Sequence, residues 1–237
     1  MSAETTNTES AILFIAGLRE IHDITKSKDM MDWEQTLVKT VQRKSILKEH
    51  ISLYNANTRR KTIIEKLKHL ASFLCEKREE ERKRVVFIYY LGHGNQTRDT
   101  SGDEEDGMDE LWCLRSGERI LDDEISLIFK DIPENSTVVL ISDSCSSGTM
   151  IDVKLNGKNW VTYSSCKDNE SAFCSFDGGI VTIFGMCPIL KQMMDEPDCQ
   201  YMPNEFFERT TKRIHIVSQQ LQMNAGNKDV LNRGWFK

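Results

Sequence analysis

Two short segments of this chain combine a reactive side chain with small residues, each directly after an apolar run. His93 lies between two glycines after the run 85–91, and Cys145 lies among serines after the run 138–141. Apolar runs without polar alternation are typical of strands buried on both faces of a parallel sheet. Open parallel sheets bind ligands at the carboxyl ends of their strands, so we expect both side chains to meet over one crevice. A thiol beside an imidazole forms a nucleophile with its base, which predicts a cysteine hydrolase.

Both residues also have a structural interpretation. A histidine after a strand often serves packing alone, and a single cysteine often behaves as a small buried hydrophobe. The glycines beside His93 allow close approach of a substrate backbone, and the polar neighbours of Cys145 are unusual for a core position. On these residues alone the two interpretations stay open. We assign the other cysteines to packing or the surface: Cys75, Cys113, Cys166, Cys174, Cys187 and Cys199.

Composition indicates one globular domain. The chain has 237 residues, 39% of them hydrophobic and 29% charged, and a net charge of −6, which disfavours nucleic acid as a partner. Seven cysteines without a CxxC pair argue against a disulfide framework and a zinc ribbon, and favour a cytoplasmic location. The polar segment 1–10 is expected to be a tail and not a signal peptide, and the apolar runs are too short to cross a membrane.

Strand and helix patterns alternate along the chain, which predicts an α/β layered fold. We expect strands at 11–17, 50–54, 85–91, 138–141 and 160–166. We expect helices at 29–47, at 122–130, at 180–194, and from 57 or 58 to a solvated, mixed-charge end at 76–84. Asn57 or Thr58 is expected to cap the second helix. Residues 204–237 indicate one further helix and a last strand at 214–217.

The loop 99–110 is strongly acidic, with seven carboxylates among twelve residues. Like charges at this density repel one another unless a cation is near, and calcium prefers such hard oxygen ligands. The EF-hand pattern fails because Glu104 stands where that loop needs glycine. The composition of the loop alone leaves both a solvated loop and a metal site open.

Five segments resemble, in the same order, those of the metacaspases, which are caspase-like cysteine peptidases. They are 90–94 (YLGHG), 102–110 (GDEEDGMDE), 122–124 (DDE), 143–148 (DSCSSG) and 165–168 (SCKD). The resemblance covers residues 11–185 and implies a caspase-like three-layer fold, with a mostly parallel central sheet and helices on both faces. It implies a single domain over 11–237, with a large-subunit-like half at 11–148 and a small-subunit-like half at 160–237. The chain is similar to a minimal single-chain type without a prodomain.

The resemblance also implies roles for individual residues. His93 matches the catalytic base and Cys145 the nucleophile, while the backbone N–H groups of Gly94 and Cys145 match the oxyanion hole. Asp143 matches an acid that lines the pocket for the P1 side chain, and Asp29 falls near the place of a second pocket acid.

Four aspartates match the calcium site of the family, where the ion would act as an activator and not in the chemistry. They are Asp109, Asp122, Asp123 and Asp152.

Three positions depart from the pattern of the family. Leu91 stands where a serine usually helps to line the P1 pocket, which puts the affinity or selectivity for substrate in question. Lys26 replaces a pocket cysteine, and Ser146 replaces a histidine that takes no part in the chemistry.

The resemblance therefore predicts a calcium-activated, monomeric cysteine endopeptidase that cleaves polypeptides after Arg or Lys through a Cys–His dyad and an acyl-enzyme. The alternative, which Leu91 supports, is a caspase-fold binding regulator with weak or no proteolytic activity. The sequence offers no candidate for a third residue behind His93. Lys154 and Lys158 are candidate sites of self-cleavage.

Overall fold

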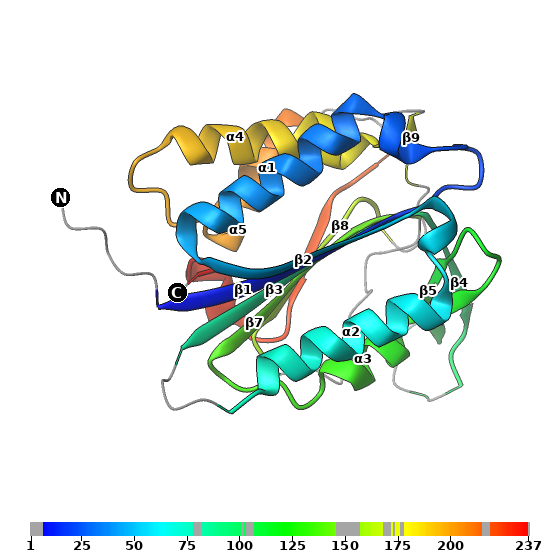
Figure 1. The fold of residues 1–237 in the computed structure, drawn as a ribbon, viewed down its shortest axis with the longest axis horizontal. Coiled ribbons are helices and arrows are strands. Elements are labelled where there is room, and N and C mark those ends of the chain that lie inside the picture. The colour runs from blue at the N-terminus through cyan, green and yellow to red at the C-terminus, as the bar shows by residue number, and fades with distance from the viewer. Residues whose placement is uncertain are drawn as a thin grey trace.

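A six-stranded sheet in the order β11-β8-β7-β3-β1-β2 forms the middle layer of the molecule (Figure 1). The structure is a computed structural model that describes residues 7–77, 82–100, 102, 107–145, 157–167, 172, 174–175 (backbone only), 178–214 and 219–236. The strands of this sheet are β1 (Thr8–Ala16), β2 (Ile46–Tyr54), β3 (Lys83–Leu91), β7 (Ser136–Asp143), β8 (Trp160–Ser164) and β11 (Gln222–Ala225). Every neighbouring pair is parallel except β8 with β11. The predicted mostly parallel sheet is confirmed.

Helices cover both faces of this sheet, as the alternating pattern predicted (Figure 1). On one face lie α1 (Lys28–Lys44), a π-helical turn η4 (Val181–Met186) that continues into α4 (Cys187–Asp195), and α5 (Pro203–Arg213). On the other face lie α2 (Arg60–Cys75) and α3 (Asp122–Phe129). Three short 3-10 turns complete the described helical segments: η1 (Ile24–Lys26), η2 (Asn55–Asn57) and η5 (Lys228–Asn232). No helix in the described part of the chain is long and apolar enough to span a membrane.

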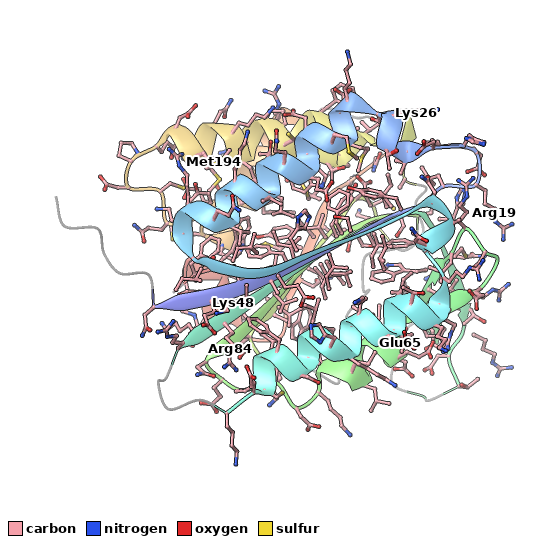
Figure 2. All side chains as sticks on the ribbon, in the orientation of Figure 1. Arg19, Lys26, Lys48, Glu65, Arg84 and Met194 are labelled. Carbon is pink, nitrogen blue, oxygen red and sulfur yellow. The ribbon has the colours of Figure 1, made fainter. Side chains whose placement is uncertain are left out.

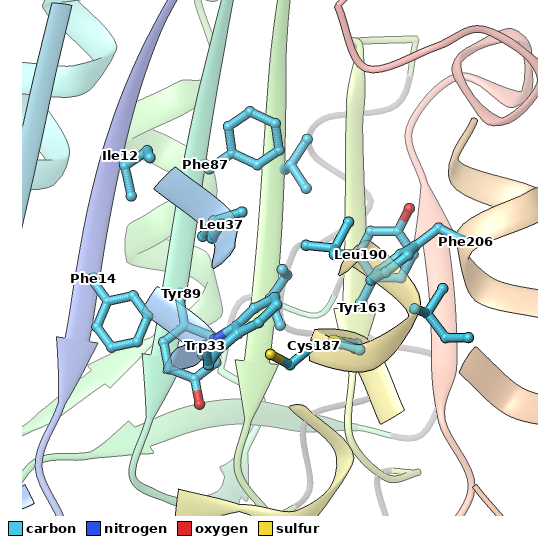
Figure 3. Close-up of a cluster of buried hydrophobic side chains, with 14 of the residues drawn as sticks. Ile12, Phe14, Trp33, Leu37, Phe87, Tyr89, Tyr163, Cys187, Leu190 and Phe206 are labelled. Carbon is cyan, nitrogen blue, oxygen red and sulfur yellow. The ribbon is translucent and has the colours of Figure 1, made fainter. Parts of the chain in front are cut away.

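The middle parts of the central strands are apolar because each face of these strands packs against a separate core. Phe87 and Tyr89 of β3 lie in the core under α1 and α4, whereas Ile88 and Tyr90 lie in the core under α2 and α3. The ring of Trp33 from α1 meets Tyr89 edge-on, with 5.7 Å between ring centroids (Figure 3). Helix α1 begins after Ser27, whose hydroxyl accepts a hydrogen bond from the N–H of Met30 at 3.1 Å.

A second, three-stranded sheet extends beyond the carboxyl end of β3. Its strands are β4 (His93–Arg98), β5 (Met108–Cys113) and β6 (Arg119–Leu121), paired antiparallel in the order β4-β5-β6. A short antiparallel pair, β9 (Cys174–Ser175) with β10 (Gly178–Gly179), lies ahead of η4. Neither small sheet was predicted from the sequence.

Several expectations about boundaries are wrong. Residues 46–47, expected in the helix 29–47, begin β2, and residues 83–84, expected in the charged end of the second helix, begin β3. Residues 8–10 belong to β1 and are buried, so the described chain enters the sheet within the expected tail 1–10. Helix α2 has Arg59 at its N-cap without a side-chain hydrogen bond; Thr58, which was expected to cap it, donates to the carbonyl of Asn55 at 2.6 Å. The last described strand is β11; Ile214, the first residue of the expected strand 214–217, lies outside any strand, and the rest of that segment falls outside the described residues.

Candidate active site

The pairing of β3 with β7 brings the two predicted catalytic residues to one place. Leu91 lies opposite Asp143 at the carboxyl ends of the two strands, so His93 and Cys145 each follow two residues later on neighbouring strands. The backbones touch there as well, because a Cβ added to Gly94 would lie 2.0 Å from the carbonyl oxygen of Cys145. A larger residue at position 94 would push the segments that carry the base and the nucleophile apart.

A buried tyrosine forms a hydrogen bond with the backbone of His93. The Tyr90 hydroxyl donates to the carbonyl of His93 at 3.0 Å and lies 3.2 Å from that of Cys113, the cross-strand neighbour of His93. The Tyr90 ring stacks on Trp112, with 4.2 Å between centroids. Full burial raises the pKa of Tyr90 well above its ordinary value, so its hydroxyl stays a donor.

The imidazole of His93 contacts a carboxylate that was not predicted from the sequence. Its Nε2 lies 2.8 Å and 3.0 Å from the two carboxylate oxygens of Glu20, in the loop after β1. The side chains of His93 and Glu20 are 40% and 63% exposed, so the pair lies open to a substrate. Seventy-three positions separate the two residues, and no local pattern in the sequence signals such a contact.

A polar network beneath the nucleophile fixes the end of β7. Trp112 donates its indole N–H to the Ser142 hydroxyl at 3.1 Å, and that hydroxyl lies 3.0 Å from the Ser144 hydroxyl. The carbonyl of Ser144 accepts from Ser165 at 3.2 Å and from the thiol of Cys166 at 3.3 Å. The segment after β8 that resembled the small-subunit half therefore supports the residue next to the nucleophile.

The Cys145 sulfur lies against the backbone of Ala172. The N–H of Ala172 donates to the sulfur at 3.3 Å, and its carbonyl oxygen lies 3.8 Å from that sulfur. Cys145 is partly exposed, whereas Cys166, Cys187 and Cys199 are buried, as expected of packing residues.

Asp143 is buried at the carboxyl end of β7, with 3% of its surface exposed. Its Oδ2 accepts a hydrogen bond from the Thr182 hydroxyl at 2.6 Å, and Gly179 lies so close that a Cβ there would be 1.7 Å from the same oxygen. Its Oδ1 is buried and has no hydrogen-bond donor among the described residues. Burial raises the pKa of Asp143 to about 6, although the hydrogen bonds from Thr182 act in the opposite direction.

The other expected pocket residues differ in burial and in where they lie relative to Asp143. Leu91 is 1% exposed and lies beside Asp143, facing the same core. Asp29 lies in the first turn of α1 with an exposed side chain, and Lys26 is exposed at the end of η1. Of this set, the structure brings only Leu91 directly beside Asp143.

Three of the four expected calcium ligands come to one corner, where β5 runs beside the start of α3. Asp109 and Asp122 are 4% and 1% exposed. Asp122 accepts hydrogen bonds from the N–H of Glu110 at 3.2 Å and of Asp123 at 2.8 Å. Asp152 and residues 103–106 of the acidic loop lie outside the described residues. Within the described ranges, no three potential ligands stand close enough together to hold a metal ion.

Comparison with known proteins agrees with this geometry. A family model described as "Metacaspase, peptidase C14 domain" matches residues 20–154, more than half of the chain. The chain belongs to the metacaspase family. The matched region contains Glu20, His93 and Cys145 together with the aspartates of the β5–α3 corner.

Curated metacaspases are similar over shorter segments. Metacaspase-3 of Arabidopsis thaliana is 32% identical over 117 residues, which are 45% of this chain and 31% of that protein. Metacaspase-1 of Saccharomyces cerevisiae is 40% identical over 72 residues, 29% of this chain and 17% of that protein. Metacaspase-1 of Candida glabrata is 38% identical over 73 residues, 29% of this chain and 19% of that protein. The matched part of this metacaspase-family chain thus spans less than a third of the length of these relatives.

The fold is shared with a solved bacterial structure. The crystal structure of protein GSU0716 from Geobacter sulfurreducens superposes with a TM-score of 0.65 and covers 94% of this chain and 96% of that chain. Sequence identity between the two is 17%, so the likeness concerns the fold alone. It supports the caspase-like arrangement of a mostly parallel sheet between helical layers.

Proposed function

We propose that this protein is a calcium-activated cysteine endopeptidase that cleaves polypeptides after Arg or Lys. The observation that carries the proposal is the parallel register of β3 and β7, which sets His93 and Cys145 on adjacent segments whose backbones touch. A caspase-like cysteine peptidase needs this pair side by side, since the thiolate attacks and the imidazole exchanges the proton.

In the proposed reaction the Cys145 thiolate attacks the carbonyl carbon of the scissile peptide and forms a tetrahedral intermediate. The N–H groups of Gly94 and Cys145 would stabilise its oxyanion. The imidazolium of His93 gives its proton to the leaving amine, and the C–N bond breaks to leave a thioester on Cys145. Water then attacks the thioester, His93 takes its proton, and the released acid restores the thiolate and the imidazolium.

Asp143 supports the preference for a basic P1 side chain. A buried carboxylate with an unpartnered oxygen is costly by itself and is stabilised by a cation that donates to it. Arginine is expected to be preferred over lysine because its planar guanidinium can make two parallel hydrogen bonds. Leu91 adds bulk beside Asp143, so we expect a narrow pocket that tolerates few other side chains.

The β5–α3 corner supports the proposed calcium site in part. Asp109, Asp122 and Asp123 supply carboxylate oxygens from two adjoining segments, and the proposed fourth ligand is Asp152. Calcium accepts six to eight oxygens in irregular arrangements, which suits such scattered donors better than the strict octahedron of magnesium. When bound, the ion would draw the Asp152 segment toward this corner and bias the cleft that follows Cys145; it would take no part in bond breaking.

The proposal also covers the cellular compartment, the oligomeric state and the partners of the enzyme. All six cysteines whose side chains are described are free thiols, which supports a reducing compartment such as the cytoplasm. We propose a monomer that acts on polypeptides and on neither nucleic acid nor membranes.

The test is a fluorogenic peptide panel that varies P1 through Arg, Lys, Asp and Leu, run with calcium and with excess chelator. We expect cleavage after Arg and Lys in calcium only. The Cys145→Ala variant should lose turnover, while Cys75→Ala, which removes an exposed thiol on α2, should keep it.

Substantial turnover by Cys145→Ala, or faster cleavage after Asp than after Arg, would contradict the proposal. A wild-type protein that binds basic peptides without cleaving them would instead support the binding regulator.

A further inference from the structure

The loop after β1 carries Glu20 directly onto the imidazole of His93. Both carboxylate oxygens lie within 3.0 Å of Nε2, and the shorter distance is 2.8 Å. Because an ionised carboxylate only accepts hydrogen bonds, the Nε2 atom of His93 must carry the proton in this contact. The other ring nitrogen, Nδ1, is then the one that exchanges a proton during a reaction.

An arginine holds this loop to the hairpin that carries His93. Arg115, in the turn after β5, donates through Nη1 to the carbonyls of Leu18 and Ile21. Its Nη2 donates to the carbonyl of His22 at 3.5 Å. Since β5 pairs with β4 and so with His93, the same hairpin fixes both ends of the Glu20–His93 contact.

An exposed ion pair contributes little to stability when its side chains are mobile. Here, however, the loop backbone is fastened on both sides of Glu20 by Arg115, so less conformational freedom is lost when the contact forms. Hydrogen bonds from its own backbone N–H and from His93 lower the pKa of Glu20, which keeps it ionised over the pH range in which enzymes of this type work.

We propose that Glu20 is a positioning residue for His93. It fixes the tautomer and the orientation of the ring and stabilises the imidazolium that faces the Cys145 thiolate, as an acidic partner does for other catalytic histidines. This inference rests on the proposed function, because it assigns a partner to the base of the same Cys–His dyad. The carboxylate comes from the loop after β1, and the arginine that anchors this loop comes from the β5–β6 turn.

The test compares Glu20→Gln with Glu20→Asp and with Glu65→Gln, a control that removes a 62% exposed carboxylate on α2. Alkylation of Cys145 by iodoacetamide is followed against pH by mass spectrometry of its peptide, with the Cys75 peptide as an internal reference. Removing the negative charge should shift the acidic limb of the Cys145 profile to lower pH by up to about half a unit, because the forming thiolate is no longer repelled by Glu20. The NMR titration midpoint of the His93 ring should move to lower pH, and Glu20→Asp should restore part of both shifts.

Peptide cleavage gives a separate measurement. Glu20→Gln should lower kcat roughly tenfold with a smaller change in KM, because a positioning residue acts on the proton transfer by His93. A variant whose alkylation profile, His93 titration and kcat all match those of Glu65→Gln would overturn the inference and leave the proposed function intact. A wild-type Cys145 that alkylates no faster than Cys75 at pH 6 would overturn both.

Discussion

At the level of a single residue, two opposing requirements act on the carboxyl group of Asp143. The proposed pocket needs an ionised carboxylate, whereas full burial favours the neutral acid and raises the pKa of Asp143 to about 6. A carboxyl group in an unfolded chain has a pKa near ~3.9. The folded state therefore binds the proton more tightly, and its stability falls as the pH rises from about 4 to about 6.

We predict that Asp143→Asn makes the fold more stable and the enzyme worse. The charge that must be buried above pH 6 is gone, so the free energy of unfolding at pH 7.5 should rise by ~1–2 kcal/mol, with no gain at pH 4. Cleavage after Arg should fall ~10–100-fold, because one charge-assisted hydrogen bond is worth ~1.5–3 kcal/mol. Urea unfolding at the two pH values and kcat/KM for an Arg peptide measure these effects.

The control for this prediction is Asp131→Asn, which removes an exposed carboxylate after α3. A loss of stability at pH 7.5 in Asp143→Asn without a loss at this control site would mean that the Thr182 hydrogen bonds outweigh the cost of the buried charge.

Single residues also show where sequence reasoning ends. His93 and Cys145 were predictable because each follows a long apolar run, and the register of two strands then sets them side by side. Glu20 was not predictable, because its partner His93 lies 73 positions away and the loop that carries Glu20 has no regular sequence pattern. The role of Asp143 in holding the start of η4 through Thr182 was likewise invisible, since it depends on the packing of Gly179.

At the level of elements, the β4–β5–β6 sheet is what the sequence failed to predict. Its strands are short, partly exposed, and interrupted by the acidic loop, so neither a periodic pattern nor a long apolar run marks them. The large parallel sheet was predictable for the opposite reason, because its central strands β1, β3 and β7 carry apolar runs. The small sheet nevertheless positions His93, Asp109 and the turn that holds the Glu20 loop.

The anchoring turn yields a prediction at this scale. Arg115→Ala should free the loop that carries Glu20, lower kcat, and shift the acidic limb of Cys145 alkylation in the same direction as Glu20→Gln. Because Arg115 acts through the loop that carries Glu20, the double variant should lose little more kcat than Glu20→Gln alone. Arg98→Ala, an exposed arginine at the end of β4, serves as the control and should leave the profile unchanged. Additive effects in the double variant would show that Arg115 acts by another route.

The β5–α3 corner yields a second prediction. Asp122→Asn combined with Asp123→Asn removes two carboxylates while asparagine keeps an acceptor for the backbone N–H groups that Asp122 binds. The calcium concentration for half-maximal activity should rise at least ~10-fold, and magnesium should activate the wild type poorly. Activity titrated against free calcium, with thermal unfolding as a check on folding, measures the change. Full wild-type activity in excess chelator, or an identical calcium response in the double variant, would remove calcium from the proposal.

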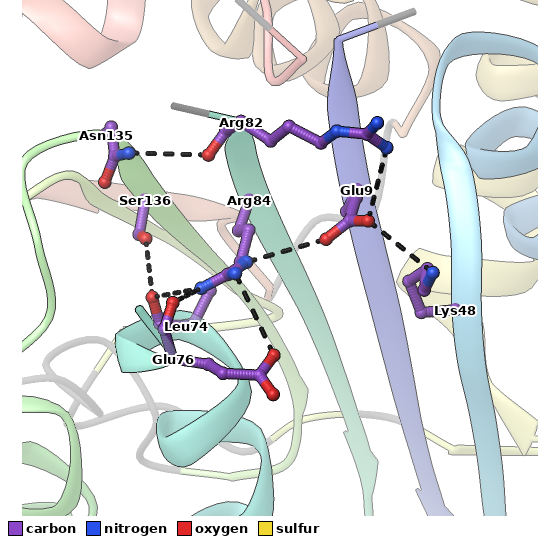
Figure 4. Close-up of polar contacts among 8 residues, drawn as sticks. All are labelled: Glu9, Lys48, Leu74, Glu76, Arg82, Arg84, Asn135 and Ser136. Carbon is purple, nitrogen blue, oxygen red and sulfur yellow. Dashed lines mark hydrogen bonds and ion pairs between the residues drawn. The ribbon is translucent and has the colours of Figure 1, made fainter. Parts of the chain in front are cut away.

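At the scale of the whole molecule, the end of the sheet opposite the active site holds a buried charge cluster. Glu9 of β1 is 1% exposed and lies 3.7 Å from Arg84 and 3.5 Å from both Arg82 and Lys48 (Figure 4). Arg84 also donates to the carbonyl of Leu74 at 3.2 Å, which closes the end of α2. Figure 2 shows Lys48 and Arg84 far from Arg19, which lies beside Glu20 in the loop near the active site. The cluster therefore concerns stability and not catalysis.

We predict that Glu9→Gln lowers the free energy of unfolding by up to ~3 kcal/mol, because the buried guanidinium of Arg84 then keeps only the half-exposed carboxylate of Glu76, at 3.9 Å, as its counter-charge. Lys48→Ala, whose side chain is 42% exposed, should cost less than ~1 kcal/mol. Urea denaturation compares the two variants, and kcat of the folded protein should be unchanged in both. Equal losses in the two variants would contradict a special role for the buried contact.

The parallel pairing of β7 with β8 has a consequence for any nick in the connection between them. Cys145 follows the carboxyl end of β7, whereas Lys158 lies before the amino end of β8, where its ammonium group donates to the carbonyl of Ile132 at 3.0 Å. A cut between residues 146 and 156, for example after Lys154, would leave β8 of the C-terminal fragment hydrogen-bonded to β7 of the N-terminal fragment and to β11 of its own fragment. Such a two-chain product should run as two bands on a denaturing gel and elute as one particle of unchanged size. Such a cut would break the covalent connection between β7 and β8 and leave the hydrogen-bonded sheet intact.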